Sequence, residues 1–344
     1  MKAVVIRKHF PSIQDIRVSE EPDPVLDYES EVDNVIIDII YASANFVDIL
    51  YVAGKHQNNK FLKPPFILGL EASGIVTAAK PNSRFKKGDR VFGAFQGAFA
   101  TKALVPASAL RHLPPPNALV KWSLADVAGI SSTFVTSYGG LDLAKLKPGE
   151  SILVHAGAGG LGLTAIMFAK AMGASCIIAT ASSSKKLDVA RHYGADFCVN
   201  YVTNPKWEDE VNRLTNGKGV NVVFDPVGLV KQSIRCTAYN GRVLVIGFAG
   251  RTNETLEDLP VNRVLLKQIH LLGWRAGENG RNFPWEKLRL EHETWNWVAS
   301  GKIKPINYET VFEGLESVPR ALQAIQSRES WGKVIVHVQK QAQL

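Results

Sequence analysis

The chain has 344 residues, of which 46% are hydrophobic and 21% charged, and its formal net charge is +8. A chain of this length exceeds the size at which one hydrophobic core usually stops growing, so we expect two domains. No apolar run reaches the roughly 18 residues that a membrane-spanning helix needs, which argues against a membrane protein. The basic residues are scattered rather than gathered in one block, so the charge does not point to nucleic acid as a partner.

The first residues and the cysteines indicate the compartment. The segment MKAVVIRKHFPS lacks the apolar core and small-residue cleavage site of a signal peptide. The three cysteines, Cys176, Cys198 and Cys236, are widely spaced, which argues against a disulfide framework and against a cysteine-rich zinc site. Together these features predict a cytoplasmic protein.

Apolar alternation broken by Pro and Gly predicts β-strands in the first third of the chain. The predicted strands span residues 2–6, 34–40, 74–79 and 89–94. They indicate a small barrel-like antiparallel domain, and a helical stretch is expected to start near Ser123.

From residue 151 onward, short apolar strands alternate with helices. The predicted strands span residues 151–155, 176–180, 197–200, 220–224, 242–246 and 270–273, and the clearest helices span residues 163–172 and 185–193. Such alternation predicts a parallel sheet covered by helices on both faces. A last strand at 332–338 is expected to rejoin the N-terminal domain, which would make the parallel sheet an insertion.

A glycine-rich turn lies between the first strand and the first helix of this second region. The segment HAGAGGLG, residues 155–162, contains the pattern G-x-G-x-x-G. In this position the glycines permit a tight turn and a close approach of the backbone to a pyrophosphate, and the helix N-terminus attracts the phosphates. The pattern also arises by chance in a chain with 28 glycines, so a turn without ligand is the alternative. The correct strand–turn–helix context favours a dinucleotide site.

The end of the second strand predicts which nicotinamide cofactor binds. NAD sites usually carry an acidic residue there, and its carboxylate would repel a 2′-phosphate. This chain has TASSSKK at 180–186 instead, with hydroxyls and two cations and no acid. The sequence therefore predicts NADPH, with Ser182 and Lys186 near the 2′-phosphate. In the alternative interpretation the serines cap the next helix and the lysines are solvated, and both interpretations can hold together.

Several blocks, in order, resemble the quinone oxidoreductase (zeta-crystallin-like) branch of the zinc-independent medium-chain dehydrogenase/reductase superfamily. They include ASANFVDILYVAGKHQ, PPFILGLEASGIV, LKPGESILVHAGAGGLG, VVFDPVGL and SRESWGKVIVHV. The resemblance implies an α/β protein with a GroES-like β-rich catalytic domain, residues 1–122 and 276–344. A Rossmann domain with a doubly wound parallel sheet, residues 123–275, would bind NADPH. It also implies a homodimer.

The resemblance assigns further residues to the cofactor. Tyr201 and Arg328 match residues that reach the 2′-phosphate, although alone they would pass for a strand-end aromatic and a surface cation. Thr136 matches a threonine beside the cofactor. The remaining cofactor positions lie in the glycine turn and in the loop expected under the nicotinamide ribose: Gly157, Gly159, Gly160, Leu161, Gly162, Gly247, Phe248 and Ala249.

Departures from the zinc-dependent relatives indicate the chemistry. Where those relatives hold zinc with a Cys and the His of a G-H-E block, this chain has Asn45 and Leu70, neither of which is a usual zinc ligand. Without a Lewis acid, we expect reduction of an electron-poor acceptor, a quinone or an α,β-unsaturated carbonyl.

Three residues are candidates for the chemical step. The Asn45 amide could donate to the acceptor oxygen, Asp48 could orient Asn45, and His56 could supply a proton, although an exposed loop position is the alternative for His56. Two other functions stay open. One is an enone or enoyl-thioester (2-alkenal) reductase, and the other is a non-catalytic NADPH-binding protein with a structural or nucleic-acid role.

Overall fold

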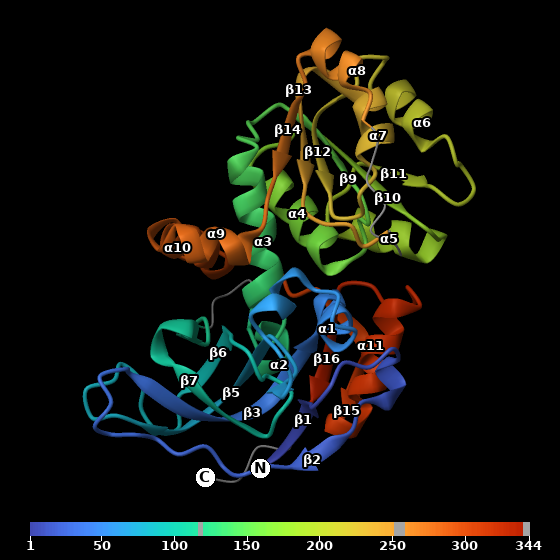
Figure 1. The fold of residues 1–344 in the computed structure, drawn as a ribbon. Helices are drawn as coiled ribbons and strands as arrows, with labels where there is room; N and C mark the ends of the chain where they lie inside the picture. Colours follow the sequence, from blue (N-terminus) through green and yellow to red (C-terminus); the bar gives the residue numbers. More distant parts are fainter. Residues whose placement is uncertain (116–119, 251–258, 340–344) are drawn as a thin grey trace. The chain divides into compact units, whose positions relative to one another are not determined.

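The computed structural model describes residues 1–115, 120–250 and 259–339 and divides into two compact units. The first unit contains residues 1–132 and the segment from residue 305 onward, and the second contains residues 133–304. The chain thus leaves the first unit, builds the second and returns (Figure 1). The domain limits expected from the sequence, at residues 122 and 275, differ from these unit limits.

The first unit is built on a mostly antiparallel sheet whose strands run in the order β15-β16-β3-β5-β6-β8, with β7 also paired to β3. Its strands are β3 (Asn34–Ala44), β5 (Glu71–Ala79), β6 (Arg90–Ala94), β7 (Lys102–Pro106), β8 (Leu110–His112), β15 (Asn307–Glu313) and β16 (Lys333–His337). The C-terminal strand β16 pairs with β3, so that Val334 lies opposite Ala44. This pairing brings Lys333 close to Asn45, the residue after β3.

A smaller sheet and short helices complete the first unit. The sheet has the order β2-β1-β4, formed by β1 (Lys2–Ile6), β2 (Val18–Glu20) and β4 (Phe66–Ile67). The helices are α1 (Phe46–Val52), α2 (Leu124–Val127) and α11 (Val318–Gln326), with 3-10 turns η1 (Ile13–Asp15), η2 (Gln57–Lys60), η3 (Ala107–Ala109) and η5 (Leu315–Ser317). Fully buried side chains from both ends of the chain, such as Ile37, Phe99 and Val334, share one core.

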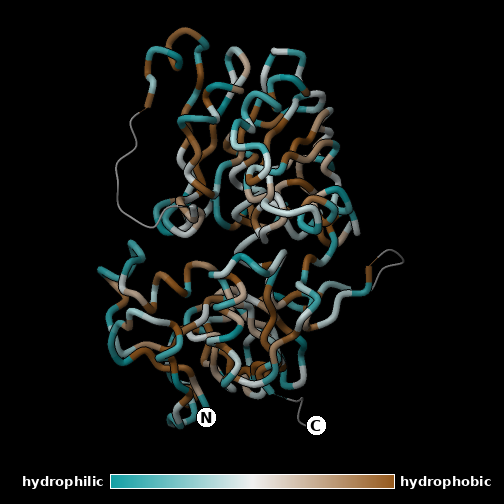
Figure 2. The backbone as a smooth tube through the Cα atoms, turned by 90° about the vertical axis from the view of Figure 1, so that its right-hand side faces the viewer, coloured by the Kyte–Doolittle hydropathy of each residue, from teal (hydrophilic) through white to brown (hydrophobic). Residues whose placement is uncertain are grey.

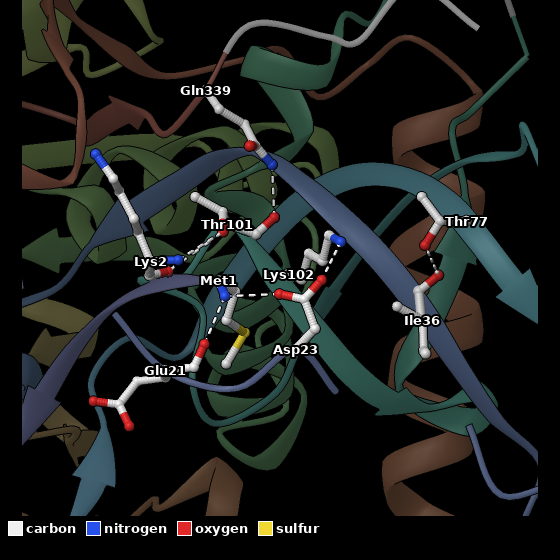
Figure 3. A network of polar contacts seen from close by, with 9 residues as sticks. All are labelled: Met1, Lys2, Glu21, Asp23, Ile36, Thr77, Thr101, Lys102 and Gln339. Carbon is white, nitrogen blue, oxygen red and sulfur yellow. Dashed lines mark hydrogen bonds and ion pairs between the residues drawn. The ribbon is translucent and has the colours of Figure 1, made fainter. Parts of the chain in front are cut away.

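Polar contacts connect segments of the first unit that are far apart in sequence (Figure 3). The Met1 ammonium donates to Glu21 O at 2.6 Å and to Asp23 Oδ1 at 2.7 Å. Near the other end of the chain, Gln339 Nε2 donates to Thr101 O at 2.6 Å. These hydrogen bonds join segments whose apolar side chains also share the core of the first unit.

The second unit contains a six-stranded sheet with the order β11-β10-β9-β12-β13-β14, in which all pairs are parallel. The strands are β9 (Ser151–Val154), β10 (Cys176–Ala181), β11 (Phe197–Asn200), β12 (Val220–Asp225), β13 (Thr237–Val245) and β14 (His270–Gly273). The order reverses beside β9, which is the strand order of doubly wound dinucleotide-binding sheets. The predicted α/β fold is therefore confirmed.

Helices lie on both faces of this sheet (Figure 1). They are α3 (Ile130–Leu143), which begins in the first unit, α4 (Gly160–Ala171), α5 (Ser184–His192), α6 (Trp207–Leu214), α7 (Val230–Ser233) and α8 (Val261–Lys267), with the turn η4 (Ile234–Cys236). Helices α9 (Ala276–Asn282) and α10 (Pro284–Ala299) pack on each other beside α3, away from the sheet (Figure 1). One face buries Leu153, Ile178 and Val223 against Trp207 and Val211 of α6. Hydrophobic stretches alternate with polar ones along the tube in Figure 2, as expected for elements that bury one side.

Candidate cofactor site and buried polar cluster

One edge of the six-stranded sheet gathers most of the predicted cofactor residues. Because the strands are parallel and Val154 lies opposite both Ala179 and Phe224, their carboxyl ends meet at this edge. The glycine turn follows β9, Ser182 follows β10 and Tyr201 follows β11, while Gly247 to Ala249 follow β13. Ligands of doubly wound sheets bind at the carboxyl edge, where the strand order reverses.

The glycine turn requires glycine at two positions. A Cβ atom at Gly157 would lie 2.7 Å from Ala179 Cβ, and one at Gly162 would lie 2.2 Å from the backbone oxygen of Ala156. Gly159 is the N-cap of α4 and has no side chain that could occupy the helix N-terminus. The first N–H groups of a helix have no intrahelical acceptor, so this turn can receive a pyrophosphate.

Two buried polar residues that the sequence analysis did not single out shape this edge. His155 is fully buried, with Nδ1 3.0 Å from Thr180 Oγ1 and Nε2 3.0 Å from Ser233 Oγ. Burial lowers the pKa of His155, which keeps the ring neutral. Asp225 accepts hydrogen bonds from the backbone N–H groups of Val227 and Gly228, each at 2.9 Å, and so folds the loop after β12.

The residues predicted to select the 2′-phosphate lie around the N-terminus of α5. Ser183 is the N-cap of this helix, and its Oγ accepts from Lys186 N at 3.4 Å. Capping by the serine segment is thus present in the structure. The side chains of Ser182, Lys186 and Tyr201 are all partly exposed, as a site for a soluble ligand requires.

Helix α3 is fixed to the glycine turn. Ser137 Oγ donates to Leu161 O at 3.0 Å, and Trp274 Nε1 donates to the Thr136 backbone oxygen at 2.9 Å. Thr136 is partly exposed, and the Phe248 side chain is 54% exposed.

Arg328 belongs to the first unit, where it follows α11 with φ of 58° and an exposed side chain.

In the first unit, Asn45, Glu71 and Lys333 form a buried polar cluster. Lys333 Nζ lies 2.8 Å from Glu71 Oε1 and 2.5 Å from Asn45 Oδ1. The other carboxylate oxygen, Glu71 Oε2, accepts from Ser132 N at 2.9 Å, in the first turn of α3. The lysine and glutamate side chains are only 3% and 0% exposed.

Both amide hydrogens of Asn45 have acceptors. Its Nδ2 donates to Ser43 O at 3.1 Å and to Glu71 Oε1 at 3.0 Å. The reverse orientation of the amide would place its oxygen against these two acceptors and its NH2 group against the Lys333 ammonium, so the contacts assign this orientation. A substrate oxygen would have to share one of these hydrogens or replace Ser43 O.

Asp48 lies beside this cluster, in α1. Its Oδ2 accepts from Asn45 N at 2.8 Å, while its Oδ1 is buried and has no hydrogen-bond partner among the residues that the structure describes. Burial raises the pKa of the Asp48 carboxyl to about 7, although the Asn45 N–H and the Lys333 charge act in the opposite direction. The carboxyl group therefore holds the backbone of Asn45 in place.

His56 lies at the N-terminus of η2 and is partly exposed. Its Nδ1 accepts from Asn58 N at 3.1 Å, and its ring stacks on Tyr51 with centroids 4.3 Å apart. Because Nδ1 is an acceptor, the neutral ring carries its proton on Nε2.

Within the described ranges, no group of three or more His, Cys, Asp or Glu side chains has the arrangement of a metal site. The helices in those ranges are also too short or too polar to span a bilayer.

A doubly wound nucleotide-binding sheet inserted into a mostly antiparallel β unit defines the class of medium-chain dehydrogenases and reductases. Family models agree with this assignment: the alcohol dehydrogenase GroES-like domain matches residues 31–115, and the zinc-binding dehydrogenase domain matches residues 160–290. The chain is 34% identical to quinone oxidoreductase-like protein 2 of Bos taurus over 92% of this chain and 86% of that protein.

Two further similarities extend the comparison. The quinone oxidoreductase of Thermus thermophilus, solved alone and with NADPH, has a TM-score of 0.78 and 27% identity over 98% of this chain and all of that one. Highly-reducing polyketide synthase 1 of Aureobasidium melanogenum contains a segment, 14% of its length, that is 31% identical over 93% of this chain. The chain belongs to the quinone oxidoreductase-like branch of the medium-chain dehydrogenase/reductase superfamily.

Proposed function

We propose that the chain is an NADPH-dependent reductase that transfers hydride to quinones or related α,β-unsaturated carbonyls without zinc. The observation that carries the proposal is the carboxyl edge of the parallel sheet. There, the glycine turn has no room for a Cβ atom at Gly157 or Gly162. The neighbouring strand end carries serines and Lys186 and no acidic residue. The crystal structure of a 27% identical quinone oxidoreductase in complex with NADPH supports the choice of cofactor.

NADPH would supply the hydride, and the protein would hold and orient the cofactor. The glycine turn and the α4 N-terminus would bind the pyrophosphate. Lys186 would pair with the 2′-phosphate, joined by Ser182, Tyr201 and Arg328, because a charged donor makes a strong bond to phosphate. The nicotinamide half would lie against Thr136, Gly247, Phe248 and Ala249.

At the acceptor, the protein must stabilise the negative charge that develops on an oxygen. Asn45 is the proposed donor to that oxygen, Asp48 fixes its backbone, and His56 is a candidate proton source in its protonated, imidazolium form. Asn45 and Leu70 replace the residues that would hold zinc in the metal-dependent relatives, so the proposed reaction uses hydrogen bonds in place of a Lewis acid.

The cofactor assignment is tested with Lys186→Ala. A charge-assisted contact contributes about 1.5–3 kcal/mol, so NADPH should bind roughly ten- to a hundredfold more weakly, while NADH binding should change little. Lys218→Ala is the control, since Lys218 is an exposed lysine that precedes β12 at the opposite edge of the sheet. Titration calorimetry would measure both cofactors; equal losses for NADPH and NADH would refute the role of Lys186.

The acceptor class is tested by NADPH oxidation with a panel of quinones, 2-alkenals and enoyl thioesters. Turnover with quinones supports the proposal, and turnover confined to alkenals or thioesters supports the alternative enone or enoyl-thioester reductase. NADPH binding without oxidation by any acceptor would favour the non-catalytic alternative. A cytoplasmic location remains a prediction.

We further propose a homodimer formed along β14. This strand is one of the two edge strands of the parallel sheet, and α8, which directly precedes it in the chain, exposes Val261, Leu265 and Leu266 at 70%, 78% and 74%. Pairing of two edge strands about a twofold axis would cover this apolar surface.

A further inference from the structure

The buried pair of Lys333 and Glu71 is expensive to maintain, which calls for an explanation. Both charges are removed from water, and the desolvation penalty of such a pair often exceeds the attraction between its members. Replacement of such a pair by packed apolar residues is often neutral or stabilising. A buried ion pair next to a candidate active-site amide is therefore better explained by what it does to that amide.

The surroundings of Lys333 fix the position of its ammonium group. The side chain passes over Gly129, where a Cβ atom would lie 2.8 Å from Lys333 Cε. Glu71 is fixed in turn by the N–H of Ser132, where the α3 N-terminus favours a negative charge. The Lys333 ammonium is thus held by two oxygens, Asn45 Oδ1 and Glu71 Oε1, and its carbon chain is held against Gly129.

This arrangement acts directly on Asn45. An ammonium that donates to Oδ1 draws electron density from the amide, which strengthens the hydrogen bonds that Nδ2 donates. The same contact prevents the amide from turning over. The Lys333 ammonium has three N–H groups, and in the described part of the chain two of them find acceptors.

We propose that Lys333 is a positioning residue for the reductase reaction: its buried ammonium orients and polarises the Asn45 amide, which in turn stabilises the negative charge on the acceptor oxygen. The inference rests on the proposed function. In the zinc-dependent relatives, a metal ion stabilises the negative charge on the substrate oxygen. Here the positive charge of Lys333 would do so through Asn45.

A structural role for the ion pair makes a different prediction, and paired variants separate the two. Lys333→Met leaves Glu71 buried without its cation and should lower the melting temperature strongly. Adding Glu71→Gln removes the unpaired charge, so the double variant should recover most of that melting temperature. If Lys333 served only the fold, activity would recover with stability.

The experiment measures single-turnover hydride transfer at saturating NADPH for wild type, Lys333→Met and the double variant. We expect the double variant to transfer hydride at least tenfold more slowly than wild type, with NADPH affinity within threefold. The loss should be largest for weakly electrophilic acceptors, because strongly electron-poor quinones stabilise their own negative charge. A double variant within twofold of the wild-type rate, or an equal loss for every acceptor, would overturn the inference.

Gly129→Ala provides a second test that keeps both charges. The new methyl group would displace the lysine chain and hence the ammonium. We expect a slower hydride transfer than wild type and the same dependence on acceptor strength, whereas an unchanged rate would count against the inference. If the wild-type chain reduces no acceptor, the proposed function itself is wrong. If wild type and all variants are equally active, only the role of Lys333 is wrong.

Discussion

Asp48 is a fully buried carboxyl group, and its contribution to stability should depend on pH. Desolvation raises its pKa in the folded chain to about 7 from the ordinary value of 3.8. Between these two pH values, Asp48 is therefore protonated in the folded state and ionised in the unfolded state. Stability must then fall as pH rises from about 4 to about 7, and the full cost of the buried anion remains above pH 7. The Lys333 charge reduces this cost and the Glu71 charge increases it.

The prediction is tested with Asp48→Asn, which keeps an oxygen to accept from Asn45 N and does not ionise. Relative to wild type, the free energy of unfolding of the variant should be higher at pH 8 than at pH 5, by an amount on the order of 1–3 kcal/mol, and its melting temperature should rise accordingly. Thermal unfolding between pH 5 and pH 8 gives both curves. Parallel curves would show that Asp48 keeps the same charge throughout this range.

The sequence could not predict the contact between Lys333 and Glu71. Lys333 lies inside the strand predicted at 332–338, and Glu71 precedes the strand predicted at 74–79, so no local pattern connected the two residues. Their contact joins residues 262 positions apart and depends on the pairing of β16 with β3. A lysine within a mostly apolar strand is the signal that the sequence offers for Lys333, whereas the glycine turn was singled out by its local motif, and Asn45 and Asp48 by the resemblance.

At the scale of elements, local patterns predicted strand positions better than strand lengths. The strands at 2–6, 197–200 and 270–273 have the predicted bounds. Strand β3 extends to Ala44, beyond the predicted residue 40, because β16 supplies a partner for its second half. Strand β13 begins at Thr237, before the predicted residue 242, although Tyr239 and Asn240 are exposed. Pairing partners far away in sequence set these lengths.

The turn before α4 provides a prediction about an element. In Gly162→Ala the new Cβ would lie 2.2 Å from Ala156 O, a backbone atom, so the turn and α4 must move apart. Overpacking of this kind costs about 1–3 kcal/mol, and the moved N–H groups should bind NADPH at least tenfold more weakly. Gly277→Ala is the matched control, because Gly277 lies in helix α9 and, outside its own helix backbone, no atom of the described residues lies within 4 Å of its Cβ position. Melting curves and NADPH titration should separate the two variants; equal behaviour would mean that the turn tolerates a side chain.

At the scale of the whole molecule, each unit has its own core, and the site residues fall into two groups accordingly. The cofactor residues of the parallel sheet lie in the second unit, and Asn45, Asp48, His56, Lys333 and Arg328 lie in the first. The sequence predicted both folds, because strand and helix periodicities differ between the two regions. It placed residues 276–304 with the catalytic domain, whereas α9 and α10 lie in the second unit.

The proposed dimer gives the prediction that belongs to this scale. Three exposed apolar side chains lie on the seven-residue helix that directly precedes the edge strand β14, and the proposed dimer would cover them. Leu265→Glu would place a charge at the centre of that surface, and burying it without a partner costs several kcal/mol. Light scattering coupled to size exclusion should therefore report a dimer for wild type and a monomer for Leu265→Glu. Leu288→Glu is the control, since Leu288 is also largely exposed, at 59%, but belongs to α10, which α9 separates from β14 in the chain. Dissociation by both variants, or by Leu288→Glu alone, would place the subunit contact elsewhere, and a monomeric wild type would exclude it.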